Sequence, residues 1–113
     1  MDQRHAELLR RLAINDERAL DTVLRMSGDE DLDAALNPVT RALVRLAAVV
    51  ALHPAPESLH WAVAVALAAG ATDDDVAETL VAVAPIVGLA RAHWAAPELA
   101  AALDCEMDGT GRE

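Results

Sequence analysis

The sequence predicts an all-α protein, a compact bundle of about six helices. Of its 113 residues, 54 % are apolar but only 2 % are aromatic, with no Phe and no Tyr. Ala, Leu and Val must therefore build the core, and Ala and Leu favour helices, whereas a sheet needs more β-branched and aromatic side chains. Helix-start signals at Asn37-Pro38 and Thr72–Asp75, and apolar residues at helical spacing from Leu8 to Leu12, agree with this class.

The N-terminal third predicts two helices. The first runs from about Asp2 to Ile14, because Leu8, Leu9 and Leu12 fall on one face and Arg10 and Arg11 on the opposite face. The second begins after an N-cap at Asn15 or Asp16, with acidic residues in its first turn. It stops at Ser27-Gly28, where a solvated acidic loop follows.

The next two helices are bounded by prolines. Asn37 is an N-cap, and the proline after it predicts a helix from Pro38 to Leu52, because proline at the first helical position loses no hydrogen bond. Pro54 and Pro56 cannot continue that helix. Pro56 can open the next one, which ends at Gly70, a residue suited to the left-handed position after a helix.

The C-terminal part predicts two further helices. Thr72 and Asp75 form a T-x-x-D capping box, and the three consecutive aspartates complement the positive end of the helix dipole. Pro85 should kink or break this helix. The last helix begins near Arg91, and Pro97 is expected to interrupt or restart it. The predicted organisation is an N-terminal helical extension (1–33), a helical domain (34–104) and a flexible tail (105–113).

The central helices predict an oligomer. The stretches "LAAVVAL", "WAVAVALAAGA" and "TLVAVAPIVGLA" are apolar on more than one face. A helix that is apolar all round must be buried all round, and one small domain has too few other elements to cover three such helices. We therefore expect other subunits to cover part of this surface.

Charge and cysteine usage exclude several classes of function. Nine basic residues, all of them Arg, stand against 19 acidic ones, a net charge of −10. Phosphate backbones and anionic lipids would repel such a chain, so neither nucleic-acid nor membrane binding is expected. The longest uncharged stretch, Ser58 to Thr72, is shorter than the about 20 residues that a membrane-spanning helix needs. The charged N-terminus does not resemble a signal peptide, and Cys105, the single cysteine, cannot form an internal disulfide, so we expect a cytoplasmic protein.

A metal site is not expected, although "HPAPESLHW" places His53, Glu57 and His60 close together in the sequence. The two prolines separate His53 at the end of one helix from Glu57 and His60 at the start of another. No strong pattern such as H-E-x-x-H is present. We expect no metal and no other cofactor.

The order of three motifs resembles the carboxymuconolactone decarboxylase family, which includes the alkylhydroperoxidase D-like proteins. The motifs are N-P-x-T-R from Asn37, A-x-x-x-G-A-T-x-x-[DE]-[VI]-A-E from Ala66 to Glu78, and A-P-I-V-G-L-A-R-A from Ala84 to Ala92. The resemblance covers Leu36 to Leu103. It implies an all-α fold and a homo-oligomer, usually a trimer or hexamer.

The resemblance also implies active-site positions that this chain does not fill. In the thiol peroxidase branch, a C-x-x-C pair and a histidine precede the A-x-x-x-G-A motif; these slots hold Ala55, Ser58 and Ala62 here. The acidic residue that helps to activate the thiols in that branch is also missing, because its position holds Ala42 or Leu43 here. Peroxide reduction needs one thiol to attack and a second to resolve the product, so we expect a protein that is not a thiol peroxidase.

Two His-Trp pairs remain as candidates for a different use of the same region. His60 and His93 are the candidate acid/base residues. Trp61 and Trp94 are candidates for the walls of a pocket, or for core or subunit contacts. Arg91 could bind a carboxylate or lie on the surface. The candidate binding residues are Glu57, Ser58, Trp61, Arg91 and Trp94.

Two functions follow from these features. The first is a redox-inactive relative that binds or transforms a small apolar or carboxylated molecule through His60 and His93; if it is an enzyme, it is a lyase, decarboxylase or isomerase. The alternative is a non-catalytic oligomer, retained as a scaffold or for partner binding. The missing thiols, acid and histidine favour the alternative, and the polar residues kept among alanines and valines favour the first.

Overall fold

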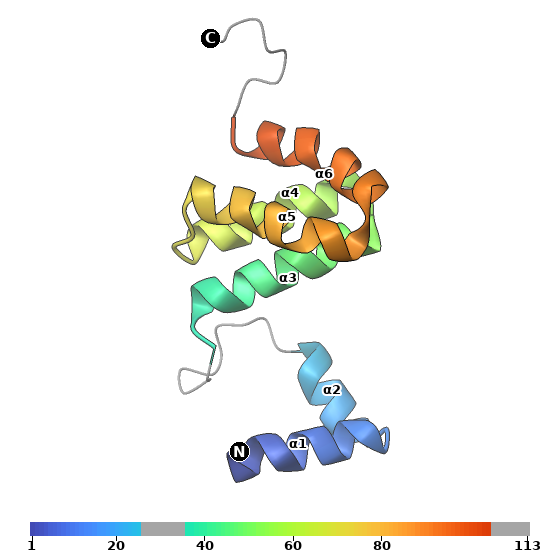
Figure 1. The fold of residues 1–113 in the computed structure, drawn as a ribbon. Coiled ribbons are helices and arrows are strands. Elements are labelled where there is room, and N and C mark those ends of the chain that lie inside the picture. Colours follow the sequence, from blue (N-terminus) through green and yellow to red (C-terminus); the bar gives the residue numbers. More distant parts are fainter. Residues whose placement is uncertain (26–35, 105–113) are drawn as a thin grey trace, which may run out of the picture. The chain divides into compact units, whose positions relative to one another are not determined.

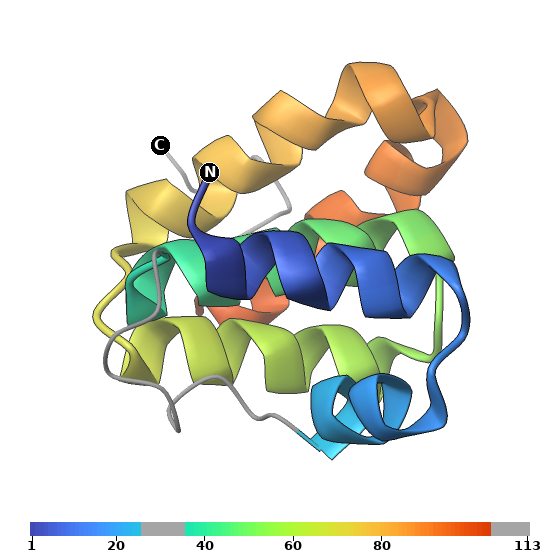
Figure 2. The ribbon, with the colours of Figure 1, turned by 90° about the horizontal axis from the view of Figure 1, so that it is seen from below.

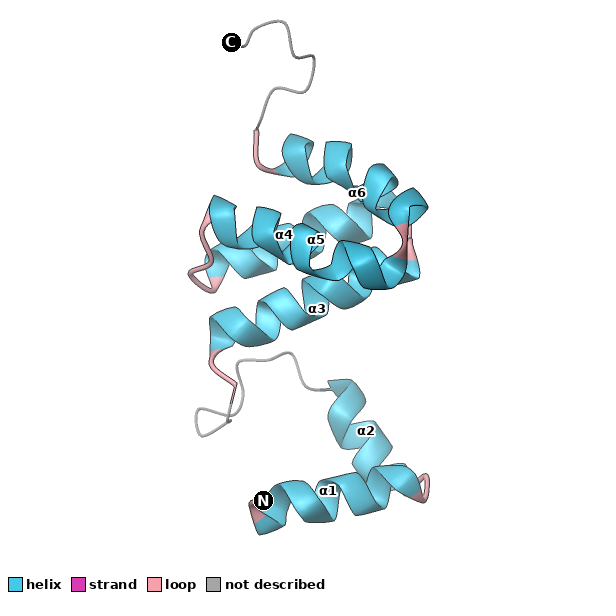
Figure 3. Cartoon of the chain, in the orientation of Figure 1, coloured by secondary structure: helices cyan, strands magenta, loops and turns pink. Residues whose placement is uncertain are grey.

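The computed structural model describes residues 1–25 and 36–104, which form six helices and no strand, as Figure 3 shows. The all-α prediction is confirmed. The helices are α1 (Gln3–Ala13), α2 (Glu17–Arg25), α3 (Pro38–Leu52), α4 (Pro56–Ala68), α5 (Asp73–Val87) and α6 (Leu89–Ala102). The predicted loop at Ser27-Gly28, the predicted tail and Cys105 lie outside the described residues. No helix in the described ranges is long and apolar enough to cross a membrane.

The chain divides into two compact units, residues 1–33 and 34–113. In the first unit, Asp2 caps α1 by accepting a hydrogen bond from the Arg4 amide at 3.0 Å. Asp16 caps α2, because its Oδ1 accepts from the Arg18 and Ala19 amides at 2.9 and 3.2 Å. Ala19 is the only residue of these two helices that is buried. Helices α1 and α2 therefore bury almost no core between them.

In the second unit, the ends of α3 follow the sequence signals. Asn37 Oδ1 accepts from the Thr40 amide at 2.8 Å, and Pro38 is the first helical residue. The helix ends at His53, whose backbone is left-handed, with φ 52° and ψ 56°. Its amide donates to the carbonyls of Val49 and Val50. Pro56 then opens α4, as expected.

The predicted capping box of α5 is confirmed. Asp75 donates its amide to Thr72 Oγ1 at 3.0 Å, and Thr72 donates its amide to Asp75 Oδ2 at 2.9 Å. Gly70, before this turn, has φ 111°, a conformation that an L side chain disfavours.

Two predictions need correction: that Pro85 breaks its helix, and that Pro97 interrupts or restarts the last one. Pro85 does not break α5, which continues to Val87. A proline inside a helix lacks one amide donor and crowds the carbonyl four residues earlier, and α5 continues here although that one backbone hydrogen bond is lost. The break comes at Gly88, with φ 97°, and α6 begins at Leu89 rather than Arg91. Pro97 neither interrupts nor restarts α6, which runs to Ala102.

Helices α3 to α6 form a closed ring of contacts around one core. α3 packs against α4 and α5, and α6 packs against the same two helices from the other side (Figures 1 and 2). Alanines let the backbones approach closely, and the largest fully buried side chains fill the remaining space: Leu46, Val50, Leu59, Val63 and Val76. This ring places one edge of α4 against α6, where the candidate site lies.

Candidate functional site

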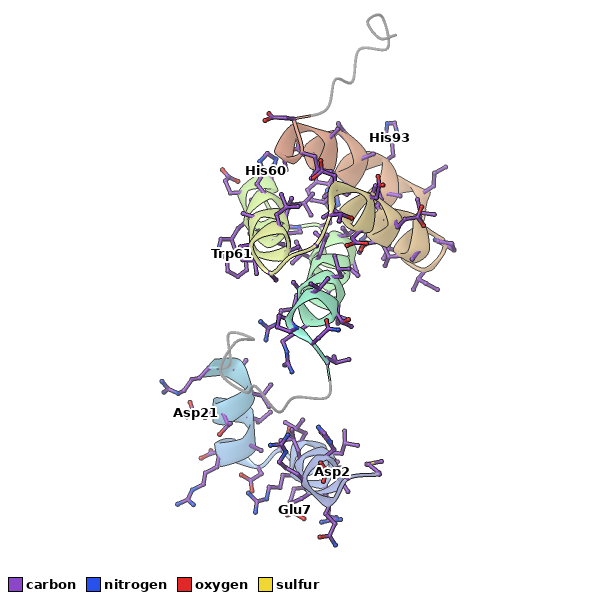
Figure 4. The ribbon with its side chains drawn as sticks, turned by 90° about the vertical axis from the view of Figure 1, so that its left-hand side faces the viewer. Asp2, Glu7, Asp21, His60, Trp61 and His93 are labelled. Atoms are coloured by element: carbon purple, nitrogen blue, oxygen red, sulfur yellow. The ribbon has the colours of Figure 1, made fainter. Side chains whose placement is uncertain are left out.

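The principal site residue on α4 is His60, which reaches a carboxylate on α6. Its Nε2 lies 3.0 Å from Glu98 Oε1. The two side chains are 43 % and 32 % exposed, so the pair is open to a solute but partly shielded. Figure 4 shows His60 at the edge of α4 that borders α6. The ring packing of the helices therefore joins two residues that are 38 positions apart in the sequence.

The Glu98 carboxylate fixes how the His60 ring can act. An ionised carboxylate only accepts hydrogen bonds, so this contact requires the proton on Nε2. In the neutral ring, Nδ1 is then an acceptor, and it has no hydrogen-bond partner among the described residues. A carboxylate in this position also holds the ring in one orientation. The arrangement is that of a general base with an orienting acid.

A second contact lies next to this pair. The ring of His53 stands against the ring of Trp94 on α6, with centroids 4.2 Å apart and planes inclined at 46°. His53 is exposed, and Trp94 is partly buried against the core. The loop between α3 and α4 is thereby tied to α6.

His93 does not join His60. It lies five residues before Glu98 on the same helix, which is about 140° around the axis. Its side chain is exposed, and Figure 4 shows it projecting from α6 on the side away from α4. The two histidines predicted as acid/base candidates therefore do not share a site: His60 lies between α4 and α6, and His93 lies on the opposite side of α6.

The predicted binding residues are likewise dispersed. Trp61 is 66 % exposed, and Glu57 and Ser58 are exposed at the start of α4. Arg91 is exposed, and its Nη1 donates to the Val87 carbonyl at 3.4 Å, so the guanidinium turns back toward α5. Of the predicted binding residues, Trp94 is the one whose ring contacts a histidine, His53.

The active-site positions that the resemblance implies do not lie on the side of α4 that carries His60. Ala55 is the exposed N-cap of α4, and the amide of Ser58 donates to its carbonyl at 3.0 Å. Ala62 is buried in the core, only 4 % exposed. Two helical positions separate His60 from Ala62, about 200° of rotation. His60 therefore does not replace the missing histidine but serves a different edge of α4.

Two residues of this region, Glu98 and His53, were not predicted as residues of this site. Glu98 follows Trp94 by four positions, which places both on one face of α6, and this spacing was a usable signal. The partners of Glu98 and Trp94 were not predictable, because they depend on how α4 and the preceding loop pack on α6. Across the described ranges, no group of three or more His, Cys, Asp or Glu side chains is placed to hold a metal ion.

The fold and the motifs define an all-α protein with a histidine–carboxylate pair on its helical ring. The family model for the carboxymuconolactone decarboxylase family matches residues 17–102, and the chain belongs to this family. The match begins at the start of α2, whereas the resemblance based on the three motifs begins at Leu36. The family model therefore also covers α2, where the sequence shows no recognisable motif. No curated protein and no solved structure matches the chain significantly.

Proposed function

We propose that this member of the family binds a small organic molecule and moves a proton at His60, without thiol chemistry. One observation carries the proposal: the 3.0 Å contact between His60 Nε2 and Glu98 Oε1, made by side chains from two different helices. Glu98 orients the ring, and Nδ1 takes or returns the proton of the bound molecule. The reactions that such a group serves are those of a lyase, decarboxylase or isomerase, in which a proton leaves or joins carbon or oxygen.

Thiol chemistry is left out of the proposal on chemical grounds. Reduction of a peroxide needs a thiolate and a second thiol that closes the disulfide. The printed sequence holds one cysteine, and the positions of the pair hold Ala55 and Ser58. A serine hydroxyl has no accessible redox couple and cannot take the place of either thiol.

A metabolite binding screen tests this function, with the wild type, His60→Ala and a matched control, His93→Ala. The control removes the same side chain from an exposed position of α6. We expect at least one small molecule that binds to the wild type and to His93→Ala but not to His60→Ala. Equal binding by all three proteins would contradict a site at His60.

The apolar surface of the second unit favours a second function, assembly. Five large apolar side chains are between 63 % and 84 % exposed: Leu52, Trp61, Val81, Ile86 and Leu89. Isolated exposed apolar residues are ordinary, but the stretch from Ile86 to Leu89 contains no charged residue, so these exposed side chains form one apolar segment. We propose that copies of this chain cover these side chains in a homo-oligomer, with a trimer or hexamer expected.

Multi-angle light scattering of the full chain at micromolar concentration tests the assembly. We expect an oligomer, and Ile86→Glu combined with Leu89→Glu should lower its mass because both charges would be buried on association. Arg10→Glu in the first unit is a control for an added acid at an exposed site. A well-folded wild-type monomer would contradict the proposal.

A further inference from the structure

The backbone at His53 is the first sign of a role beyond ending a helix. His53 adopts φ 52° and ψ 56°, the left-handed region that glycine and asparagine occupy most readily after a helix. Sparsely populated backbone conformations persist where surrounding contacts hold them, and they gather at functional sites. Here the surrounding contact is the ring of Trp94, 4.2 Å away.

The two contacts on α6 lie one helical turn apart. Trp94 and Glu98 are separated by four positions, so their side chains are neighbours on one face of the helix. His53 stands on the first, and His60 is hydrogen-bonded to the second. A single face of α6 therefore carries an aromatic contact and an acid/base pair side by side, with an exposed imidazole over the first and a half-exposed one over the second.

The charged residues beside His60 on α4 and α6 are both acidic. Glu98 touches its ring, and Glu57 precedes it by three positions on the same face of α4. The nearest cationic residue along the α6 face is Arg91, but its guanidinium is directed back to the Val87 carbonyl. Long side chains on a helix point toward its N-terminus, so Arg91 extends away from Glu98.

We propose that His53 and Trp94 form the second half of the His60 site, and that this site takes an uncharged or cationic molecule with a planar ring. The ring of the ligand lies along the His53–Trp94 contact, and its proton-exchanging group meets Nδ1 of His60. Glu57 and Glu98 attract a cation and repel an anion. The inference rests on the proposed function and departs from the sequence-based expectation of an apolar or carboxylated ligand, because a carboxylate would be repelled at this site.

Three probes of one shape and different charge test the proposal. The full-length ¹⁵N-labelled protein is titrated with benzamidine, benzamide and benzoate, which are cationic, neutral and anionic near neutral pH. The observed signals are the ring nitrogens of His53 and His60 and the indole N–H of Trp94. We expect benzamidine and benzamide to shift all three residues, and benzoate to bind at least about tenfold more weakly, because like charges repel.

Two variants at one position separate the ring from the backbone. His53→Gly and His53→Asn both suit a left-handed residue, so neither should lower the melting temperature. Both remove the aromatic contact, and we expect benzamide to bind about threefold to tenfold more weakly, the value of one aromatic contact. Arg91→Ala, three positions before Trp94 on α6, is the control, because the structure directs this guanidinium to the Val87 carbonyl and away from the site; it should leave benzamidine and benzamide binding unchanged.

The outcomes distinguish this inference from the proposed function. Probe shifts at His60 with none at His53 or Trp94, or unchanged binding in both His53 variants, would overturn the role of His53 and leave His60 in place. Benzoate that binds as tightly as benzamidine, and loses affinity in Arg91→Ala, would overturn the charge preference. No shift at either histidine with any probe would contradict both.

Discussion

The two His-Trp pairs of this chain have the same sequence but turn different residues toward the neighbouring helix. In His60-Trp61 the histidine faces a neighbouring helix and contacts Glu98, while the tryptophan is 66 % exposed. In His93-Trp94 the tryptophan is the inward residue, against the core and His53, while the histidine is exposed. One pair therefore offers an imidazole to the site and the other offers an indole.

The difference has a simple geometric cause. Adjacent helical residues are about 100° apart around the axis, so only one member of each pair can face the neighbouring helix. Which member does so depends on the rotation of α4 and α6 in the ring, not on the dipeptide. A repeated motif on two helices is thus weak evidence for a repeated function.

The largest expected difference between the two pairs is the stability that each tryptophan contributes. Trp94→Ala removes a partly buried indole that packs against the core, and we expect it to lower the free energy of unfolding by about 2–3 kcal/mol, less than a fully buried tryptophan loses. Trp61→Ala should change it by less than about 0.5 kcal/mol. Urea unfolding followed by circular dichroism measures both. Equal losses in the two variants would contradict the assignment of Trp94 as the inward residue.

A smaller effect separates the histidines. In a double-mutant cycle, His60→Ala and Glu98→Ala should show a coupling energy of about 0.5–1 kcal/mol, reduced by solvent because both side chains are partly exposed. The control cycle with His93→Ala and Glu98→Ala should give a coupling near zero, since these residues lie on different faces of α6. A larger coupling in the control than in the test cycle would reverse the roles of the histidines.

The smallest expected effect is that of His93 alone. His93→Ala should change the free energy of unfolding by less than about 0.5 kcal/mol, because the side chain is exposed and makes no hydrogen bond or ion pair within the described ranges. Thermal unfolding of the wild type and the variant, at one protein concentration, measures this. A clear loss of stability would indicate that another subunit covers His93.

Local signals predicted the fold well where one residue decides the outcome. The N-caps Asn37 and Thr72 act through side-chain hydrogen bonds to amides three residues later, so the sequence alone was sufficient. The interruption predicted at Pro97 was wrong, because the local cost of a proline is offset there by tertiary packing. Pro97 lies between Ala95 and Leu99, both buried in the core, and their burial keeps α6 continuous.

The candidate site was only half predictable. His60 and Trp94 could be singled out as unusual residues in an Ala- and Val-rich chain. Their partners could not, because Glu98 is 38 positions from His60 and their contact depends on the packing of α4 against α6. The left-handed backbone of His53 was not predictable either, because this position after a helix usually holds glycine and rarely histidine.

If His60 acts as a base, Glu98 must hold its ring with the proton on Nε2 and leave Nδ1 free. The most direct test is the long-range ¹H–¹⁵N spectrum of the His60 ring in the wild type and in Glu98→Ala, at a pH where the ring is neutral. We predict a protonated Nε2 and an unprotonated Nδ1 in the wild type, with slower exchange of the Nε2 proton than in the variant. A protonated Nδ1 in the wild type, or a His60 spectrum that Glu98→Ala leaves unchanged, would contradict it.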